Sequence, residues 1–332
     1  MATPVILDVD TGVDDAMALL LAALHPDLDL RAVTCVGGNA TVDDVVRNSM
    51  TVLDVAGRTD VPVARGAARA LLEPGPDARH VHGDDGMGDL GWPRSTRARD
   101  ARHAVELLRD LLVAAARSGE LVTLVPTAPL TNVALLLRTY PEAAAGLREI
   151  LFMGGAANVG NATASAEFNV FHDPEAAAIV LESAAELGVD VTMYGLDVFY
   201  DVTVTRANAA KLVAAGGHGP AELGGRLVEF VCDRYRADRA HLGDAGAVCA
   251  VIDRSALTTQ PLPVRVELSG TYSRGRTIVD RRDWSGNLDH DPHGIAPSRV
   301  DVALAVDGAR YAALWLDTIS QPFAAPAPGT RR

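Results

Sequence analysis

The sequence predicts an α/β fold in which helices cover both faces of a mostly parallel sheet. Short apolar runs typical of buried strands alternate with longer segments of helical periodicity. Polar residues and glycines follow several of these runs, as they do where strands end at the edge of a parallel sheet. The 332 residues are 48% hydrophobic. We therefore expect one large core and a single domain over residues 1–320 with a Rossmann-like sheet.

The first elements set the pattern. Val5–Leu7 is an apolar run that predicts a short strand, and Ala16–Leu24 is helical and ends near a proline. Leu30–Val36 is rich in β-branched residues and predicts a second strand. Val42–Ala56 is helical, with Gly57 as its C-cap candidate.

The alternation continues to residue 193. Apolar spacing at Val105, Leu108 and Leu112 is typical of a helix. The further strands expected are Val61–Ala64, Leu121–Val125, Glu149–Met153 and Val189–Met193. The helices expected between them are Ala101–Arg117, Asn132–Arg138 and Pro174–Leu187.

The second half has a different pattern. Pro263–Leu268 and Gly275–Val279 are expected to form a late antiparallel pair. Two loops, Arg65–Asp100 and Asp280–Ser298, are long enough to suggest a functional role. Residues 321–332 are rich in proline and alanine and predict a disordered tail. The helices expected here are Arg206–Lys211, Glu222–Arg239, Ala245–Ile252 and Tyr311–Ile319.

Composition excludes several classes of partner. The net charge is −13 and the pI is about 5.1, and no basic patch of any length is present, which argues against nucleic acid and anionic membranes. The three cysteines lie in apolar surroundings without CxxC spacing, so we expect buried free thiols in a reducing cytosol. A strand begins almost at the first residue, and no apolar run reaches the roughly 20 residues of a membrane helix. These features predict a cytoplasmic protein.

Four aspartates crowd into eight positions after the first strand. Asp8, Asp10, Asp14 and Asp15 repel one another, and a core does not tolerate them unpaired. A hard cation such as Ca²⁺, which takes about six to eight oxygens, resolves this repulsion. The turn at Gly12 lets Asp10 and Asp15 reach one ion, and the absence of His and Cys from the cluster argues against zinc. The alternative, capping of the following helix, explains only one or two of the aspartates.

Polar residues also follow the other predicted strands. Ligands bind beyond the carboxyl ends of strands in an open parallel sheet, so we expect these residues to converge on one site. For Asn161 and Asn169 the alternative is ordinary turn chemistry, whereas Glu167, between Ala166 and Phe168, is harder to explain in that way. The residues concerned are Asn39, Thr127, Asn161, Glu167, Asn169 and Asp197.

The motif LDVDTGVDDAMAL at 7–19 resembles the N-terminal signature of the inosine-uridine preferring nucleoside hydrolase family, D-x-D-P-G-x-D-D-A, with Thr11 in place of the usual Pro. The resemblance covers roughly residues 5–315, and several motifs in the right order are more specific than any single one. The further similar segments are VGGN at 36–39, HGDDGMG at 82–88, LVPTAPLTNVA at 124–134 and MGGAANVGNATASAEFNVFHDPEAA at 153–177.

The resemblance implies a nucleoside hydrolase fold and a Ca²⁺-dependent N-ribohydrolase. It implies that a metal-bound water attacks the anomeric carbon, with Asp10 as general base and an oxocarbenium-like transition state. Asp8 is expected to be structural support, and Asp14 to take part in catalysis. The implied metal ligands are Asp10, Asp15, the carbonyl of Thr127 and Asp244. The implied substrate-binding residues are Asp14, Asn39, Met153, Asn161, Glu167 and Asn169.

The sequence departs from the family where the leaving base is activated. In HLGDAGAV at 241–248, Gly243 stands where the family has a His directly before the last metal aspartate. Three alternatives remain: His241 reaches in, His82 acts instead, or the base is activated by stacking on an aromatic ring. The aromatic candidates are Trp92, Tyr235 and Trp284.

Two other functions compete with nucleoside hydrolysis. Asp8-Val9-Asp10 also resembles the start of haloacid-dehalogenase-like phosphatases, but Gly12 breaks that motif and the pair Asp14-Asp15 has no role in it. A catalytically impaired nucleoside- or ribose-binding homologue is the second alternative, with Gly243 marking lost chemistry. The family resemblance implies that the partner is a small-molecule ribonucleoside and that the protein assembles as a homodimer or homotetramer.

Overall fold

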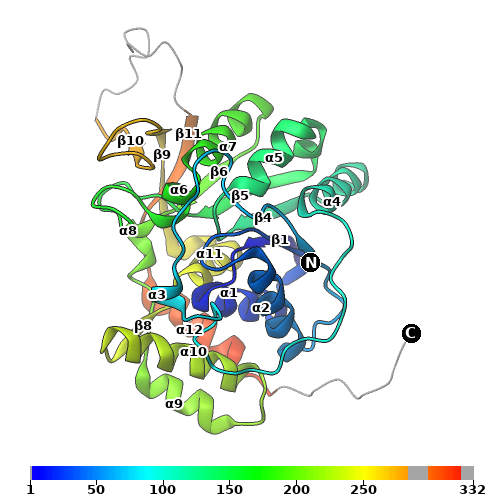
Figure 1. The fold of residues 1–332 in the computed structure, drawn as a ribbon, viewed down its shortest axis with the longest axis vertical. Helices are drawn as coiled ribbons and strands as arrows, with labels where there is room; N and C mark the ends of the chain where they lie inside the picture. The colour runs from blue at the N-terminus through cyan, green and yellow to red at the C-terminus, as the bar shows by residue number, and fades with distance from the viewer. Residues whose placement is uncertain (1, 283–297, 323–332) are drawn as a thin grey trace.

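The computed structural model describes residues 2–282 and 298–322. Its centre is a nine-stranded sheet with the order β10-β9-β11-β6-β5-β4-β1-β2-β3 (Figure 1). Neighbouring strands from β6 to β3 run parallel, and β11 runs parallel to β6. The pairs β9–β10 and β9–β11 are antiparallel and form one edge. The predicted α/β fold with a mostly parallel sheet is confirmed.

The parallel strands lie where apolar, β-branched runs predict them. Side chains of a strand alternate between the two faces of its sheet. In β1, Val5, Leu7 and Val9 therefore join one apolar cluster, and Ile6 joins the other. These strands are β1 (Thr3–Val9), β2 (Leu28–Cys35), β3 (Val63–Arg65), β4 (Val122–Pro126), β5 (Leu147–Met153) and β6 (Val191–Tyr194).

Helices cover both faces of the sheet, as expected (Figure 1). Gly57 has a φ of +69° just past α2, the left-handed backbone that favours glycine after a helix. The first cluster is covered by α1 (Val13–Leu24), α2 (Val42–Val55), α10 (Pro220–Tyr235), α11 (Asp244–Ile252) and α12 (Gly308–Ile319). The second is covered by α4 (Ala104–Ser118), α5 (Thr131–Thr139) and α7 (Pro174–Leu187).

The helix predicted over Glu222–Arg239 is wrong at its end. It stops at Tyr235 because Arg236 adopts a left-handed backbone, with a φ of +51°. Strand β8 (Arg239–His241) follows and pairs antiparallel with β7 (Thr203–Thr205). This correction matters for function, since it places His241 at the end of a strand.

The antiparallel edge is larger than expected. The predicted pair exists as β9 (Leu257–Val266) and β10 (Thr277–Val279). The sequence reasoning missed β11 (Ser298–Val306), which lies between β9 and β6. Its placement depends on partners distant in sequence: Asp301 is in register with Thr192 of β6 and with Pro261 of β9.

Shorter elements complete the described chain, and several of them surround the site. Among the described residues, no helix has both the length and the apolarity to cross a membrane. The expected tail lies almost wholly outside the described residues, as do most of the loop Asp280–Ser298 and Trp284, and the single-domain boundary at residue 320 stays a prediction. The shorter elements are α3 (Arg79–His82), α6 (Phe168–His172), α8 (Leu196–Phe199), α9 (Arg206–Ala215) and the 3₁₀ turns Pro141–Gly146 and Arg254–Ala256.

Candidate active site

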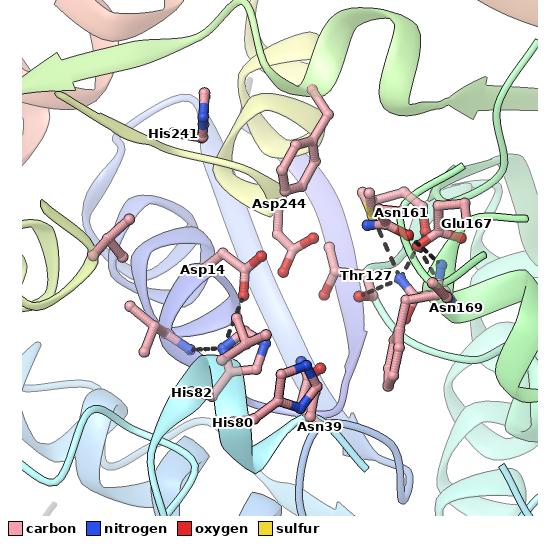
Figure 2. Close-up of a pocket in the computed structure, with 18 of the residues that line it drawn as sticks. Asp14, Asn39, His80, His82, Thr127, Asn161, Glu167, Asn169, His241 and Asp244 are labelled. Carbon is pink, nitrogen blue, oxygen red and sulfur yellow. Dashed lines mark hydrogen bonds and ion pairs between the residues drawn. The ribbon is translucent and has the colours of Figure 1, made fainter. Parts of the chain in front are cut away.

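A cavity of about 440 Å³ lies beyond the carboxyl ends of the parallel strands (Figure 2). Polar residues that follow β1, β2, β4 and β5 meet there, as expected. Asp10 and Asp15 lie beneath the lining, with fully buried side chains. The sequence-predicted residues that line the cavity are Asp14, Asn39, His82, Thr127, Met153, Asn161, Glu167, Asn169, Tyr235, His241 and Asp244.

Asp10 is held by the loop after β2. One carboxylate oxygen accepts the backbone N–H of Asn39 at 2.7 Å, and the other accepts the Asn39 Nδ2 at 3.1 Å. A Cβ on Gly38 would lie 2.0 Å from the Asp10 carboxylate, so only glycine lets this backbone approach. The glycine pair after the second strand therefore forms the cradle of a buried acid.

Asp15 is held by three different segments. Its carboxylate accepts the Gly12 N–H at 2.9 Å, the Thr127 Oγ1–H at 2.7 Å and the Asn39 Nδ2 at 3.3 Å. The Asn39 amide thus joins Asp10 and Asp15. A Cβ on Gly12 would lie 2.7 Å from both Asn39 Nδ2 and His82 Nδ1, which explains glycine at this turn.

The carboxyl groups of the site resist ionisation. Burial, followed by the charge of neighbouring acids, raises the pKa of Asp15 to about 6 and holds the pKa values of Asp10 and Asp244 well above their ordinary range. Burial also raises the pKa of Asp14 to about 6. No lysine or arginine lines the described cavity to offset these charges. A bound cation would therefore stabilise the ionised forms.

The donor set fits a hard cation. Carboxylate oxygens of Asp14, Asp15 and Asp244 lie within 4.8 Å of one another. Oδ1 of Asp14 is buried without a hydrogen bond and lies 3.8 Å from the His82 Nδ1. Oxygen ligands of this type suit Ca²⁺. This cluster contains Asp14 where the sequence reasoning had Asp10, so the assignment of Asp10 as a ligand stays a prediction.

Thr127 joins the carboxylate cluster to Asn169. Its hydroxyl donates to Asp15, and its carbonyl oxygen accepts the Asn169 Nδ2 at 3.0 Å. The same Nδ2 lies 3.2 Å from the carbonyl oxygen of Met153. The donors of the Asn169 amide are thus occupied, which leaves its Oδ1 as the acceptor for a ligand hydroxyl.

Glu167 is the N-cap of α6 and a buried carboxylate. It accepts the backbone N–H groups of Asn169 at 2.8 Å, Gly155 at 2.9 Å and Val170 at 3.1 Å. Burial nevertheless raises its pKa to about 7. Nearby, Asn161 Oδ1 accepts the Phe168 N–H at 2.9 Å. Capping therefore explains part of this segment, and both side chains still face the cavity.

The two candidate histidines differ in their bonding. His82 Nδ1 accepts the Val13 N–H at 3.1 Å, so any proton on the neutral ring is on Nε2, and burial lowers its pKa to about 4. His241 Nδ1 lies 3.0 Å from the carbonyl oxygen of Tyr200. A carbonyl only accepts, so this nitrogen carries a proton and Nε2 is left for exchange.

The aromatic candidates Tyr235 and Trp92 also differ, because only one of them lines the cavity. Tyr235 lines the cavity and is 58% exposed. Trp92 does not line it, and its ring instead packs edge-on against His218 with centroids 5.9 Å apart. The sequence reasoning missed other lining residues, including Phe199, Tyr200 and His80. Phe199 and Tyr200 follow Asp197 after a central strand, so their position past a strand end was the available signal.

Asp8 faces away from the cavity and supports it. Its Oδ1 accepts the Thr34 hydroxyl at 2.6 Å and the Asn132 Nδ2 at 2.8 Å. Asn132 also donates to the Cys35 carbonyl oxygen at 3.0 Å, which ties the ends of β1 and β2 to α5. Asp8 is not among the cavity-lining residues.

Comparisons with known proteins assign the family. Residues 5–313 match the family model described as inosine-uridine preferring nucleoside hydrolase. The chain belongs to this family. This hydrolase is 40% identical over 286 residues to the inosine-uridine preferring nucleoside hydrolase of Leishmania major, covering 85% of the chain and 89% of the relative. It is likewise 40% identical over 292 residues to a pyrimidine-specific ribonucleoside hydrolase of Enterobacter sp. (strain 638), covering 86% and 91%.

Solved structures agree with the family assignment. The purine-preferring ribonucleoside hydrolase from Gardnerella vaginalis superposes with a TM-score of 0.84 at 30% identity, covering 96% of this chain and 98% of that one. The hydrolase is therefore an enzyme that acts on N-glycosidic bonds. The phosphatase and non-catalytic alternatives are not favoured by these relatives.

Proposed function

We propose that this hydrolase is a calcium-dependent ribonucleoside hydrolase that releases ribose and a free base. The observation that carries the proposal is the carboxylate cluster of the half-buried Asp14 and the buried Asp15 and Asp244, beside polar groups suited to ribose hydroxyls. The relatives named above include purine-preferring, pyrimidine-specific and inosine-uridine preferring enzymes. We therefore propose ribonucleosides as the substrate class.

The metal site in this proposal consists of Asp10, Asp15, the Thr127 carbonyl and Asp244. When bound, Ca²⁺ supplies positive charge that orients two ribose hydroxyls and lowers the pKa of a neighbouring water. Support comes from the donor chemistry, which is all oxygen, and from the carboxylates of Asp15 and Asp244, whose oxygens lie within 4.8 Å of each other.

Asp10 serves as the general base. The N–H and Nδ2 of Asn39 fix its carboxylate, and burial together with the charge of Asp15 raises its pKa. A base of raised pKa is a better proton acceptor near neutral pH. Asp10 takes a proton from the attacking water, whose oxygen bonds to the anomeric carbon while the C–N bond breaks and its electron pair leaves with the base. The sugar passes through an oxocarbenium-like transition state.

The ribose is held by groups of both hydrogen-bonding types. Asn169 offers its Oδ1, since its Nδ2 is bonded to Thr127 and Met153. Asp14 offers the oxygen that has no hydrogen bond in the described chain. The full proposed set is Asp14, Asn39, Met153, Asn161, Glu167 and Asn169.

His241 is the favoured group for protonating the leaving base. Its Nδ1 proton is directed to the Tyr200 carbonyl, which leaves Nε2 to carry the transferred proton. His82 is less suited to the task, because burial lowers its pKa to about 4 and its Nδ1 accepts the Val13 N–H. His82 instead supports the turn that carries Asp14 and Asp15.

The test is a reducing-sugar assay with inosine, adenosine, guanosine, uridine and cytidine in the presence of Ca²⁺. We expect ribose from at least one of them. No ribose from all five would overturn the proposal. Phosphate release from p-nitrophenyl phosphate with Mg²⁺, measured in parallel, would instead favour the phosphatase alternative. Tight nucleoside binding without turnover would favour the impaired homologue.

We further propose a cytoplasmic homodimer or homotetramer. The buried free thiols of the three cysteines suit a reducing compartment. Light scattering on the purified protein measures the assembly. A monomeric mass at micromolar concentration would contradict it.

A further inference from the structure

Three aromatic rings form a continuous wall on one side of the cavity. The rings of Phe199 and Tyr200 meet edge to face with centroids 5.0 Å apart, and those of Tyr200 and His241 do so at 4.9 Å. All three residues line the cavity. Edge-to-face packing of this kind holds the rings in fixed orientations.

Gly243 is what allows Phe199 to reach the carboxylates. Its φ is +55°, a backbone conformation that residues with a side chain rarely adopt. A Cβ built there would lie 2.8 Å from Cζ of Phe199 and 2.9 Å from Cβ and Oδ2 of Asp14. The tip of the Phe199 ring and the Asp14 side chain therefore occupy the space that any side chain at 243 would need.

The wall is anchored at both ends. Helix α8 begins where the Leu196 N–H donates to the Gly155 carbonyl at 3.0 Å, and the Phe199 N–H donates to the Gly195 carbonyl at 3.2 Å. The Tyr200 carbonyl accepts from His241, and the Asn161 side chain lies near the Tyr200 hydroxyl and lowers its pKa. Tyr200 thus lies between Asn161, a proposed ribose contact, and His241, the proposed proton donor to the base.

We propose that Phe199, supported by Tyr200, is the specificity-determining contact for the leaving base and recognises it as a planar heteroaromatic ring. The inference rests on the proposed function, which places a ribose hydroxyl at Asp14 and the metal at Asp244. A base on the anomeric carbon then lies next to the ring that borders Asp14. Gly243 is the residue that makes room for this arrangement.

The other side of the cavity offers a weaker surface. Tyr235 on α10 lines it as well, but it is 58% exposed and has no ring partner among the described contacts. A flexible, solvated ring loses more freedom on binding than one already fixed by its neighbours. The geometry therefore favours Phe199 over Tyr235.

The experiment compares two ligands that the enzyme does not consume. Pseudouridine has a C–C glycosidic bond in place of the N-glycosidic bond, and D-ribose lacks the base altogether. Calorimetric titration of both with Ca²⁺ present gives the gain in affinity due to the base. We expect Phe199→Ala and Phe199→Leu each to reduce that gain about ten-fold, with ribose affinity unchanged.

Phe199→Leu is the matched variant, since it keeps an apolar side chain of similar size and removes the aromatic face. Tyr272→Ala is the control, because Tyr272 is 92% exposed and outside the cavity lining. Wild-type affinity for pseudouridine in Phe199→Leu would overturn the proposal, as would equal loss for ribose and pseudouridine. If the base contribution depends on Phe199 while none of the five nucleosides yields ribose, the subsite stands and the proposed hydrolysis fails.

Discussion

The two ends of the cavity are built in different ways. At the end proposed to bind the sugar (the sugar end), Asp10, Asp15 and Asp244 are at most 3% exposed, and Asp10 and Asp15 are held by donors from loops at the strand ends. At the end proposed to bind the base (the base end), Tyr200 follows α8 and is 43% exposed, and Tyr235 is the last residue of α10 and is 58% exposed. The sugar end is formed by loops directly at the carboxyl ends of the parallel strands. The base end is formed by residues at the ends of two helices.

This difference follows from the chemistry of each end. Buried carboxylates are costly unless their partners are fixed in place, so the sugar end tolerates little change in its scaffold. An aromatic surface needs only a ring near the sugar, and several elements can supply one. In the proposed arrangement, base recognition can therefore change without a change at the ribose site, and the names of the relatives include different base preferences.

Removal of calcium is expected to have the largest effect, and to act at the sugar end. Chelation followed by desalting should reduce ribose release to background, since the charge that orients the ribose hydroxyls and lowers the pKa of the attacking water is then missing. Returning Ca²⁺ at 100 times its Kd should stabilise the fold by about 2.7 kcal/mol, measured by thermal unfolding. Asp244→Asn should lose this calcium response, and Glu186→Gln, an exposed acid on α7, should keep it. Equal melting temperatures with and without calcium would contradict the metal site.

Asp10→Asn tests directly whether Asp10 is the general base. We expect kcat to fall about 10²- to 10⁴-fold because the variant cannot accept the proton of the attacking water. Glu186→Gln serves again as the control for loss of one negative charge. Ribose release at the wild-type rate, with the variant folded by circular dichroism, would remove Asp10 from the mechanism.

His241→Asn and His82→Asn separate the two histidines. We expect His241→Asn to lower kcat about 10²-fold, because the proton donor for the base is gone. The loss in His82→Asn should be smaller, since an amide oxygen can still accept the Val13 N–H. Steady-state rates with the best nucleoside measure both. The reverse ranking would assign base activation to the HGDDGMG loop.

The pH dependence of stability reports on the sugar end without calcium. Burial raises the pKa values of Asp8 and Glu167 to about 7. Acids with raised pKa values stabilise the fold fully below their ordinary pKa, and this contribution is lost as pH rises from that value to the folded pKa. Urea unfolding of the calcium-free protein should therefore show stability that falls from about pH 4.5 to about pH 7, by up to about 1.4 kcal/mol per pH unit for each group, and that levels off above this range.

Asp8→Asn provides the control for that titration. The amide oxygen can still accept from Thr34 and Asn132, and the slope of stability against pH should become smaller. Stability that rises over this range would contradict the pKa assignments.

Trp92→Phe should have the smallest effect. Trp92 packs on His218 outside the cavity lining, so kcat/KM should change by no more than about two-fold for any nucleoside. A larger change in kcat/KM would indicate that Trp92 contacts the base, which the described cavity lining does not predict.

Sequence reasoning predicted the sugar end better than the base end. Asp10, Asp14, Asp15 and Asn39 stand directly after strands whose apolar runs are plain in the sequence, and parallel topology brings strand ends together. Phe199 and Gly243 are 44 positions apart and meet because β6 and α11 pack around the same cavity. Strand β11 was missed for a similar reason, since its order in the sheet depends on β6 and β9.

The sequence by itself determined the α/β class, the acidic cluster and the family, because these depend on local periodicity and on motifs that are contiguous in the chain. Only the tertiary structure decided which carboxylates share one cluster, that the buried His82 accepts the Val13 N–H, and that a phenylalanine ring fills the space above Gly243. Burial and contact between distant segments decide such questions, and both arise only when the sheet brings its loops to one edge.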